Sequence, residues 1–209
     1  MGNRHANALP QCQLRHLVRL IQALYPSDKT PVPFWIDTIS CPVTPKSARN
    51  RAVILMRQTY RNADKVLVLD NYMRKHKALD VPVFEPFARI YHSGWTQRLW
   101  TLQEGVLAKS LFVQFADVTI NFTESWDAMV RGQRQQTEFH NLLSFPLRIR
   151  GDWLHWGTTP FDSIQSVVIA LHESFTSVST EEPLCLGSLL DIDMDRLLEA
   201  VPDQRMKRF

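Results

Sequence analysis

The stretch HSGWTQRLWTLQEGVLAKSLFVQF, which runs from His92 to Phe115, carries the two signals that decide the fold. Its first part, residues 94–108, has tryptophan and leucine at the spacing of a helix. Its second part, residues 110–115, is a short apolar run of the kind that forms a buried strand. The stretch therefore predicts a helix that leads directly into a strand.

The same alternation is found on the amino-terminal side of this stretch. The run VLVL within residues 65–70 predicts a strand with both faces covered, and residues 34–39 predict a second buried strand. Helices are predicted around Leu17 and over residues 46–62. Helices that alternate with apolar strands are typical of an α/β fold with a parallel sheet. The pattern loosens after Asp117, so we expect a core over residues 1–120 and a mainly helical extension over residues 121–209.

Composition excludes several classes of protein. The 209 residues include 44% hydrophobic residues and carry a formal charge of +3, which is typical of a folded chain and does not indicate nucleic-acid binding. No apolar run reaches the roughly 18–20 residues that a membrane span needs, and no signal peptide opens the chain. Cys12, Cys41 and Cys185 lack metal-ligand spacing. We therefore expect a cytoplasmic protein without a metal or a membrane partner.

Candidate site residues follow from helical geometry. Trp100 and Glu104 lie four residues apart on one helix face, while the neighbouring face, with Leu99, Leu102 and Val106, is expected to pack on the sheet. Glu104 is either a functional carboxylate at the carboxyl edge of the sheet or a structural partner of Arg98 in an ion pair.

Three other aromatic or acidic residues carry similar alternatives. Trp95 and Trp100 either stack on a ligand ring or belong to the core. Asp37 is expected at the carboxyl end of the strand over residues 34–39, where it either contacts a ligand or caps a helix.

Three segments of the chain resemble the HET domain, the heterokaryon-incompatibility module of filamentous fungi. They are FWIDTISC, ILMRQTYRNADKVLVLD and SGWTQRLWTLQEGVLA, within residues 11–115. A weaker similarity follows at TSVSTEEPLCLGSLL, residues 176–190. The HET domain is distantly similar to TIR domains, several of which hydrolyse NAD. SGWTQRLWTLQEG is similar to the helix that carries the catalytic glutamate of plant TIR domains, and that similarity makes Glu104 its counterpart.

The resemblance implies a flavodoxin-like or TIR-like parallel sheet and a role in non-self recognition and programmed cell death. The family's opening strand has no counterpart here, so we expect an incomplete sheet with an unpaired edge beside the strand over residues 65–70. The function is then a recognition module that associates with itself or with another incompatibility protein. The alternatives are an NAD glycohydrolase centred on Glu104, which needs no cofactor and uses NAD as substrate, and a truncated inactive relative.

Overall fold

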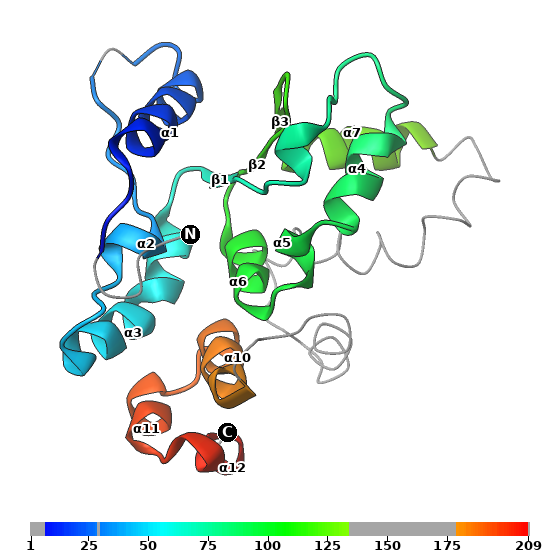
Figure 1. Cartoon of the computed structure of the whole chain (residues 1–209). Coiled ribbons are helices and arrows are strands. Elements are labelled where there is room, and N and C mark those ends of the chain that lie inside the picture. Colours follow the sequence, from blue (N-terminus) through cyan, green and yellow to red (C-terminus); the bar gives the residue numbers. More distant parts are fainter. Residues whose placement is uncertain (1–6, 29, 134–178, 209) are drawn as a thin grey trace. The chain divides into compact units, whose positions relative to one another are not determined.

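The computed structural model describes residues 7–28, 30–133 and 179–208, and side chains are described for all of these except residues 127, 129–133 and 208. The chain divides into two compact units, residues 1–56 and residues 57–209, so the division falls within helix α3 (Lys46–Asn62) (Figure 1). The predicted boundary near residue 120 separated the sheet from the carboxyl-terminal helices. In the structure both belong to the second unit.

The first unit is helical. It contains α1 (Gln11–Ala23), α2 (Asp37–Ser40) and the first part of α3, and none of the residues of these helices is fully buried. The side chain of Asn7 ties two turns of this unit together, because its amide donates to the carbonyl of Thr38 and its oxygen accepts from the N–H of Val43 at 3.1 Å.

The predicted strand over residues 34–39 is wrong. Residues 31–36 adopt no regular structure, and α2 begins at Asp37. The turn is closed locally, because the Ser40 hydroxyl accepts from the N–H of Ile36. Pro31 and Pro33 lack the N–H that a strand ladder needs. As a result Trp35 and Ile36 are half-buried, where the strand would have buried both.

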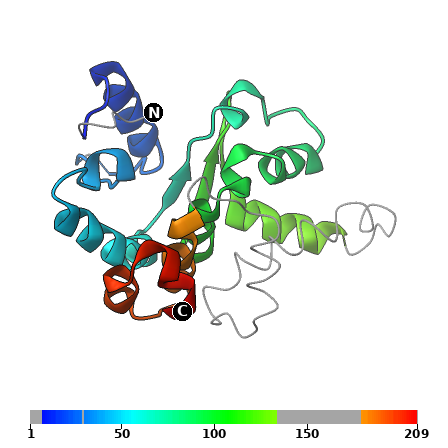
Figure 2. The ribbon, with the colours of Figure 1, turned by 60° about the horizontal axis from the view of Figure 1, so that its bottom comes forward.

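The second unit holds a three-stranded mixed sheet in the order β1-β2-β3. β1 (Val66–Val68) runs parallel to β2 (Leu111–Gln114), with Val66 opposite Leu111, and β2 pairs antiparallel with β3 (Thr119–Asn121). The parallel pair requires a long crossover, which contains the short turn η1 (Met73–Lys75) and three helices. Figure 2 shows β1 and β2 side by side.

β1 forms one edge of this sheet and β3 the other. Among the described strands, β1 pairs only with β2. β3 therefore does not fill the side of β1 where the sequence predicts an unpaired edge.

The main core lies between the sheet and the helices α4 (Phe84–Tyr91) and α7 (Phe122–Gln133). Alternate residues of β2, Leu111 and Val113, point into it. The rings of Phe87 and Phe122 meet edge to face, with their centroids 5.5 Å apart, and Phe122 stacks on Trp126. The buried members are Val66, Val68, Met73, Phe87, Ile90, Leu111, Val113, Phe115, Phe122 and Trp126.

The helix predicted over residues 94–108 is broken in two. α5 (Gly94–Gln97) and α6 (Leu99–Leu107) are separated at Arg98, whose backbone is extended at φ −85° and ψ 132°. The Thr101 hydroxyl stabilises the break by donating to the carbonyls of Trp95 and Arg98. The Ser93 hydroxyl caps α5 by accepting from the N–H of Thr96.

The apolar face of α6 does not pack on the sheet, which corrects the sequence-based expectation. Leu99, Leu102 and Val106 form a second cluster with Cys185 and Leu189 of α10 (Glu182–Leu190). Periodicity shows that this face is apolar, but it does not show which apolar surface covers it. α10 is followed by α11 (Met194–Glu199), and no helix of the described residues is long and apolar enough to cross a membrane.

Candidate functional site

The carboxylate of Glu104 lies where three elements meet. One of its oxygens accepts a hydrogen bond from the indole N–H of Trp95 on α5, at 2.9 Å. The other accepts from the hydroxyl of Tyr60, in the last turn of α3, at 3.3 Å. Both donors orient the carboxylate and satisfy part of its hydrogen-bonding capacity in a half-buried position.

Trp95 is held from both sides. Its side chain packs against the main core, and its ring lies against Gly105, where an added Cβ would stand 3.3 Å from the ring. An alanine at position 105 would therefore require the indole to shift by a few tenths of an ångström. Of the two roles considered for Trp95, these contacts show the packed one, with the indole N–H directed at Glu104.

Trp100 forms its hydrogen bond with a different carboxylate, that of Glu181. Its indole N–H donates to Glu181 at 3.2 Å, and its ring packs against the α6–α10 cluster. Trp100 and Glu104 therefore start from one helix face, but their described polar contacts lie on different elements. Glu181 was missed by sequence reasoning, although it stands in the carboxyl-terminal segment with the weaker family similarity.

Gln103, the polar neighbour of Glu104 on α6, has a buried partner on α10. Its side chain is fully buried, and its oxygen accepts a 2.8 Å hydrogen bond from the Ser188 hydroxyl on α10. One turn away, the Cys185 thiol donates to the carbonyl of Leu99 at 3.1 Å. Burial raises the pKa of the Cys185 thiol, and the charges of Glu104 and Glu182 raise it further. Cys185 therefore stays protonated and acts as a packed donor rather than a nucleophile.

Arg57 closes the other end of α10. Its guanidinium donates to the carbonyls of Ser188 and Leu189 at 2.8 and 2.6 Å, and it forms an ion pair with Asp191 at 3.1 Å. These carbonyls belong to the last turn of a helix, where a cation is favourable. Sequence reasoning did not identify this contact, because Arg57 and Ser188 lie 131 residues apart.

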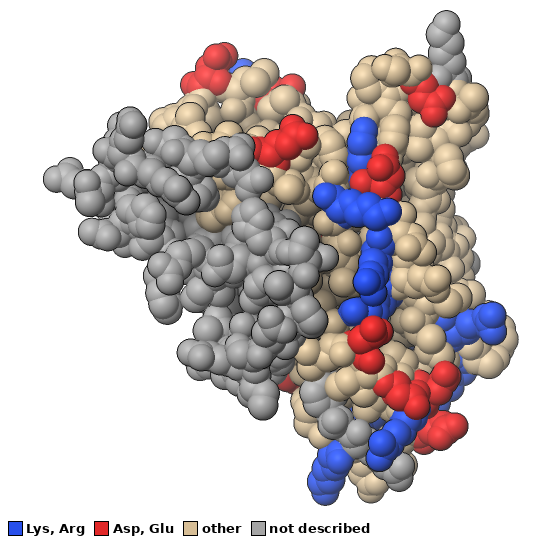
Figure 3. Space-filling model, turned by 180° about the vertical axis from the view of Figure 1, so that it is seen from behind, with Lys and Arg blue, Asp and Glu red and all other residues tan. Residues whose placement is uncertain are grey.

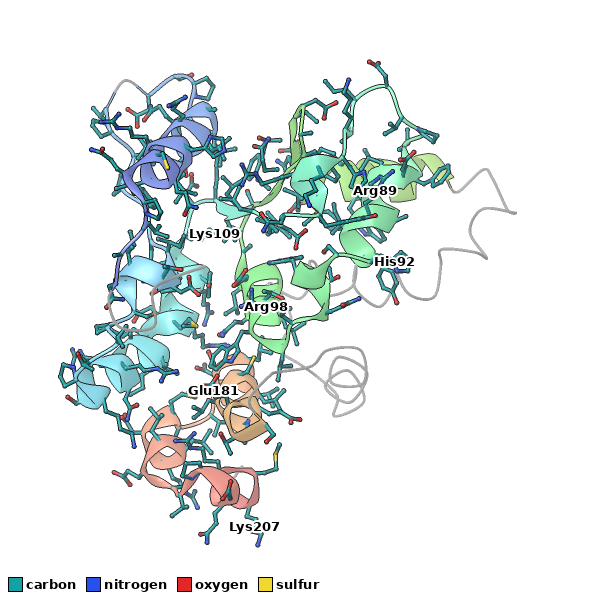
Figure 4. All side chains as sticks on the ribbon, in the orientation of Figure 1. Arg89, His92, Arg98, Lys109, Glu181 and Lys207 are labelled. Atoms are coloured by element: carbon teal, nitrogen blue, oxygen red, sulfur yellow. The ribbon has the colours of Figure 1, made fainter. Side chains whose placement is uncertain are left out.

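Arg98 does not pair with Glu104. It is exposed at the break between α5 and α6, and it makes no ion pair within the described part of the chain (Figure 4). Its backbone carbonyl, rather than its side chain, contributes to the site by accepting from Thr101.

Asp37 belongs to the first unit and does not follow a strand. It is the first residue of α2, it is exposed, and its carboxylate accepts from the N–H and the hydroxyl of Thr38. Of the roles considered for Asp37, the structure shows the local one of an acceptor in the first turn of a helix.

Glu104 was expected at the carboxyl edge of the sheet, but its contacts lie elsewhere. Tyr60 and Glu104 both come from segments that lead into a parallel strand, α3 into β1 and α6 into β2. At the carboxyl end of β1 stands Asp70 instead, which accepts from the N–H groups of Tyr72 and Met73.

Charged side chains of both signs are interspersed over the face shown in Figure 3. Within the described residues, no group of three or more histidine, cysteine or acidic side chains could hold a metal ion. No family model, curated protein or solved structure matches the chain.

The geometry around Glu104 allows simple chemistry. A half-buried carboxylate fixed by two hydrogen-bond donors can stabilise a cation or exchange a proton with a bound molecule. Trp95 presents its indole N–H to the carboxylate, while its side chain packs against the main core and Gly105. The described partners from α3 and α5 fix the orientation of the carboxylate before any ligand arrives.

Proposed function

We propose that this chain is a heterokaryon-incompatibility module of a filamentous fungus, with a TIR-like parallel core and a role in non-self recognition and cell death in the cytoplasm. The observation that carries the proposal is the meeting of the resembling segments around α6. Tyr60 comes from ILMRQTYRNADKVLVLD, and Trp95 and Glu104 come from SGWTQRLWTLQEGVLA. If these segments form one functional site, the residues of their motifs are expected to contact one another in the fold.

The carboxyl-terminal segment supports the same proposal. Glu181, Cys185 and Ser188 all stand in TSVSTEEPLCLGSLL, and each bonds to a residue of α6. Every segment of the resemblance in the second unit therefore contributes to the surroundings of this one helix.

An enzymatic form of this function centres on Glu104. Hydrolysis of NAD breaks a glycosidic C–N bond through an oxocarbenium-like state, which a nearby carboxylate stabilises as in glycoside hydrolysis. The two hydrogen-bond donors that orient the Glu104 carboxylate favour this alternative. In the non-enzymatic form, the same surface serves self-association or binding to another incompatibility protein.

The test compares the wild-type chain with two isosteric variants, expressed in a filamentous fungus under an inducible promoter. Glu104→Gln removes the charge of the site, and Glu199→Gln removes a charge from an exposed position on α11. The proposal expects growth arrest for the wild type and for Glu199→Gln, with loss of arrest for Glu104→Gln. Absence of arrest in all three proteins would contradict it and favour an inactive relative.

Incubation of the purified proteins with NAD separates the two forms. Release of nicotinamide by the wild type, lost in Glu104→Gln but kept in Glu199→Gln, would support the hydrolase. Growth arrest without nicotinamide release would leave the recognition module, for which light scattering should detect self-association.

A further inference from the structure

Residues 72–84, which comprise η1 and the loop that leads into α4, expose several apolar side chains. Val83 is 69% exposed, Leu79 52% and Tyr72 42%, which are high values for residues of this size. In Figures 1 and 2 the loop projects away from the helices of the second unit. The backbone of this loop is thus a projecting segment, and it carries the exposed Leu79 and Val83.

Hydrogen bonds to residues 116 and 117 hold the first part of the loop, residues 76–79. The carboxylate of Asp117 accepts from the N–H groups of Ala78 and Leu79 at 2.9 and 3.2 Å. The N–H of Ala116 donates to the carbonyl of His76 at 2.9 Å. Below these contacts, Met73 is fully buried in the core. Leu79 and Val83 are therefore exposed on a loop whose first part is fixed by hydrogen bonds.

Basic residues precede the apolar tip. Residues 72–84 contain the exposed Arg74, Lys75 and Lys77 against one acid, Asp80. The nearby guanidinium of Arg89 is paired with Glu85. The Asp117 carboxylate at the base of the loop lies near Lys77 and offsets part of this charge. The loop still carries more basic than acidic side chains beside its exposed apolar groups.

This combination fits a negatively charged lipid surface better than a protein. A stable protein interface buries about 800 Å² on each partner, whereas a bilayer surface can be contacted by a few exposed apolar side chains with neighbouring cations. At a bilayer surface the same side chains enter the headgroup region, while lysines and arginines remain among anionic headgroups. Such a contact needs no membrane-spanning helix.

We propose that the loop over residues 72–84 is a membrane-surface contact, in which Leu79 and Val83 enter the interface of an anionic bilayer and Lys75 and Lys77 bind its headgroups. The contact is separate from the Glu104 site and does not rest on the proposed function.

Vesicle co-sedimentation of the full chain tests this contact. One set of vesicles consists of phosphatidylcholine alone, and in the other about a third of the lipid is phosphatidylserine. The wild type should bind the anionic vesicles at least about tenfold more strongly, and higher salt should weaken that binding. Equal binding to both sets, or no binding to either, would overturn the proposal.

Variants locate the contact on the loop. The double change of Leu79→Ser and Val83→Ser should lower vesicle binding about tenfold. The double change of Lys75→Ser and Lys77→Ser should lower it by about fivefold for each lysine removed. Val201→Ser is the matched control, because Val201 is 59% exposed on another part of the same unit and should keep full binding.

Two controls keep the result interpretable. Thermal unfolding should show unchanged stability for the loop variants, since the substituted side chains are exposed. Glu104→Gln should bind vesicles as the wild type does, even if it loses all cell-death activity. Full vesicle binding by the folded Leu79 and Val83 double variant would reject the proposal, as would a loss of binding in Val201→Ser equal to that of the loop variants.

Discussion

The hydroxyl of Ser188 donates to the side-chain oxygen of Gln103, and both side chains are inaccessible to solvent. The two residues stand on α10 and α6, so this buried polar bond joins the carboxyl-terminal helices to the helix that carries Glu104. A polar pair in an apolar cluster specifies one register of the two helices, because any slip leaves both groups unsatisfied.

Ser188→Ala should destabilise the protein by about 1–3 kcal/mol, since it removes a hydrogen bond from the buried oxygen of Gln103. Denaturant unfolding of Ser188→Ala, Gln103→Leu and the double variant measures the coupling between the two positions. The double variant should lose less than the sum of the single changes, because it removes donor and acceptor together. Strict additivity would contradict the bond.

Trp95→Phe should keep the aromatic packing and remove the donor to Glu104. The expected cost is about 1–3 kcal/mol of unfolding free energy, because the lost bond reaches a carboxylate in a half-buried place. Thermal or urea unfolding measures it. In a Glu104→Gln background the same substitution should cost clearly less, and an equal cost in both backgrounds would show that Trp95 acts through packing alone.

Gly187→Ala should disturb the contact between α10 and α11. A Cβ at position 187 would lie 2.5 Å from the Cδ1 of Leu197 and 3.1 Å from the Sδ of Met194, so these side chains must move. Overpacking of this kind costs about 1–3 kcal/mol. Gly94→Ala is the control, because its nearest neighbour is the carboxylate of Asp70 at 3.8 Å. Calorimetric melting should drop for Gly187→Ala and stay near the wild type for Gly94→Ala.

Arg57→Ala should lower stability by about 1–3 kcal/mol, since it leaves the carbonyls of Ser188 and Leu189 without their charged donor. Asp191→Asn should change stability by less than about 1 kcal/mol, because the Asp191 side chain is 71% exposed and surface ion pairs contribute little. Asparagine also tolerates the positive φ of 61° at this position. Urea unfolding of both variants checks the difference, and equal losses would indicate that the ion pair is the main contact of Arg57.

Acid should loosen the loop over residues 72–84. Loss of solvation beside the loop alone would raise the pKa of the exposed Asp117, but hydrogen bonds from the N–H groups of Ala78 and Leu79 lower it overall below its ordinary 3.8. A lowered folded pKa means that the stabilising bonds are complete above the unfolded value and are lost as the pH falls through the folded one. Hydrogen-exchange protection of the two amides should thus hold at neutral pH and fall below pH 3.8. Protection in Asp117→Ala should be low at every pH, and a pH response that survives in this variant would rule out Asp117 as its cause.

Local sequence pattern determined most of the elements in the second unit. The predicted helix over residues 46–62 matches α3, and the apolar runs after Lys65 and Ser110 contain β1 and β2. The prediction failed where prolines and polar residues border a short apolar segment. The apolar segment over residues 34–39 has strand-forming residues, but a strand also needs a partner, and the prolines before it and the closed turn at Ser40 favour irregular chain and a short helix.

The polar residues of the central helix show where local information ends. The sequence by itself predicted one helix over residues 94–108 with an apolar face and with Glu104 on it, and the structure keeps residues 99–107 of it as α6. Only the tertiary structure decided that the apolar face meets α10, that Gln103 bonds to Ser188 across 85 positions, and that Glu104 bonds to Tyr60 across 44. The physical reason is that periodicity reports the polarity of a surface, whereas the partner of that surface depends on how distant segments pack.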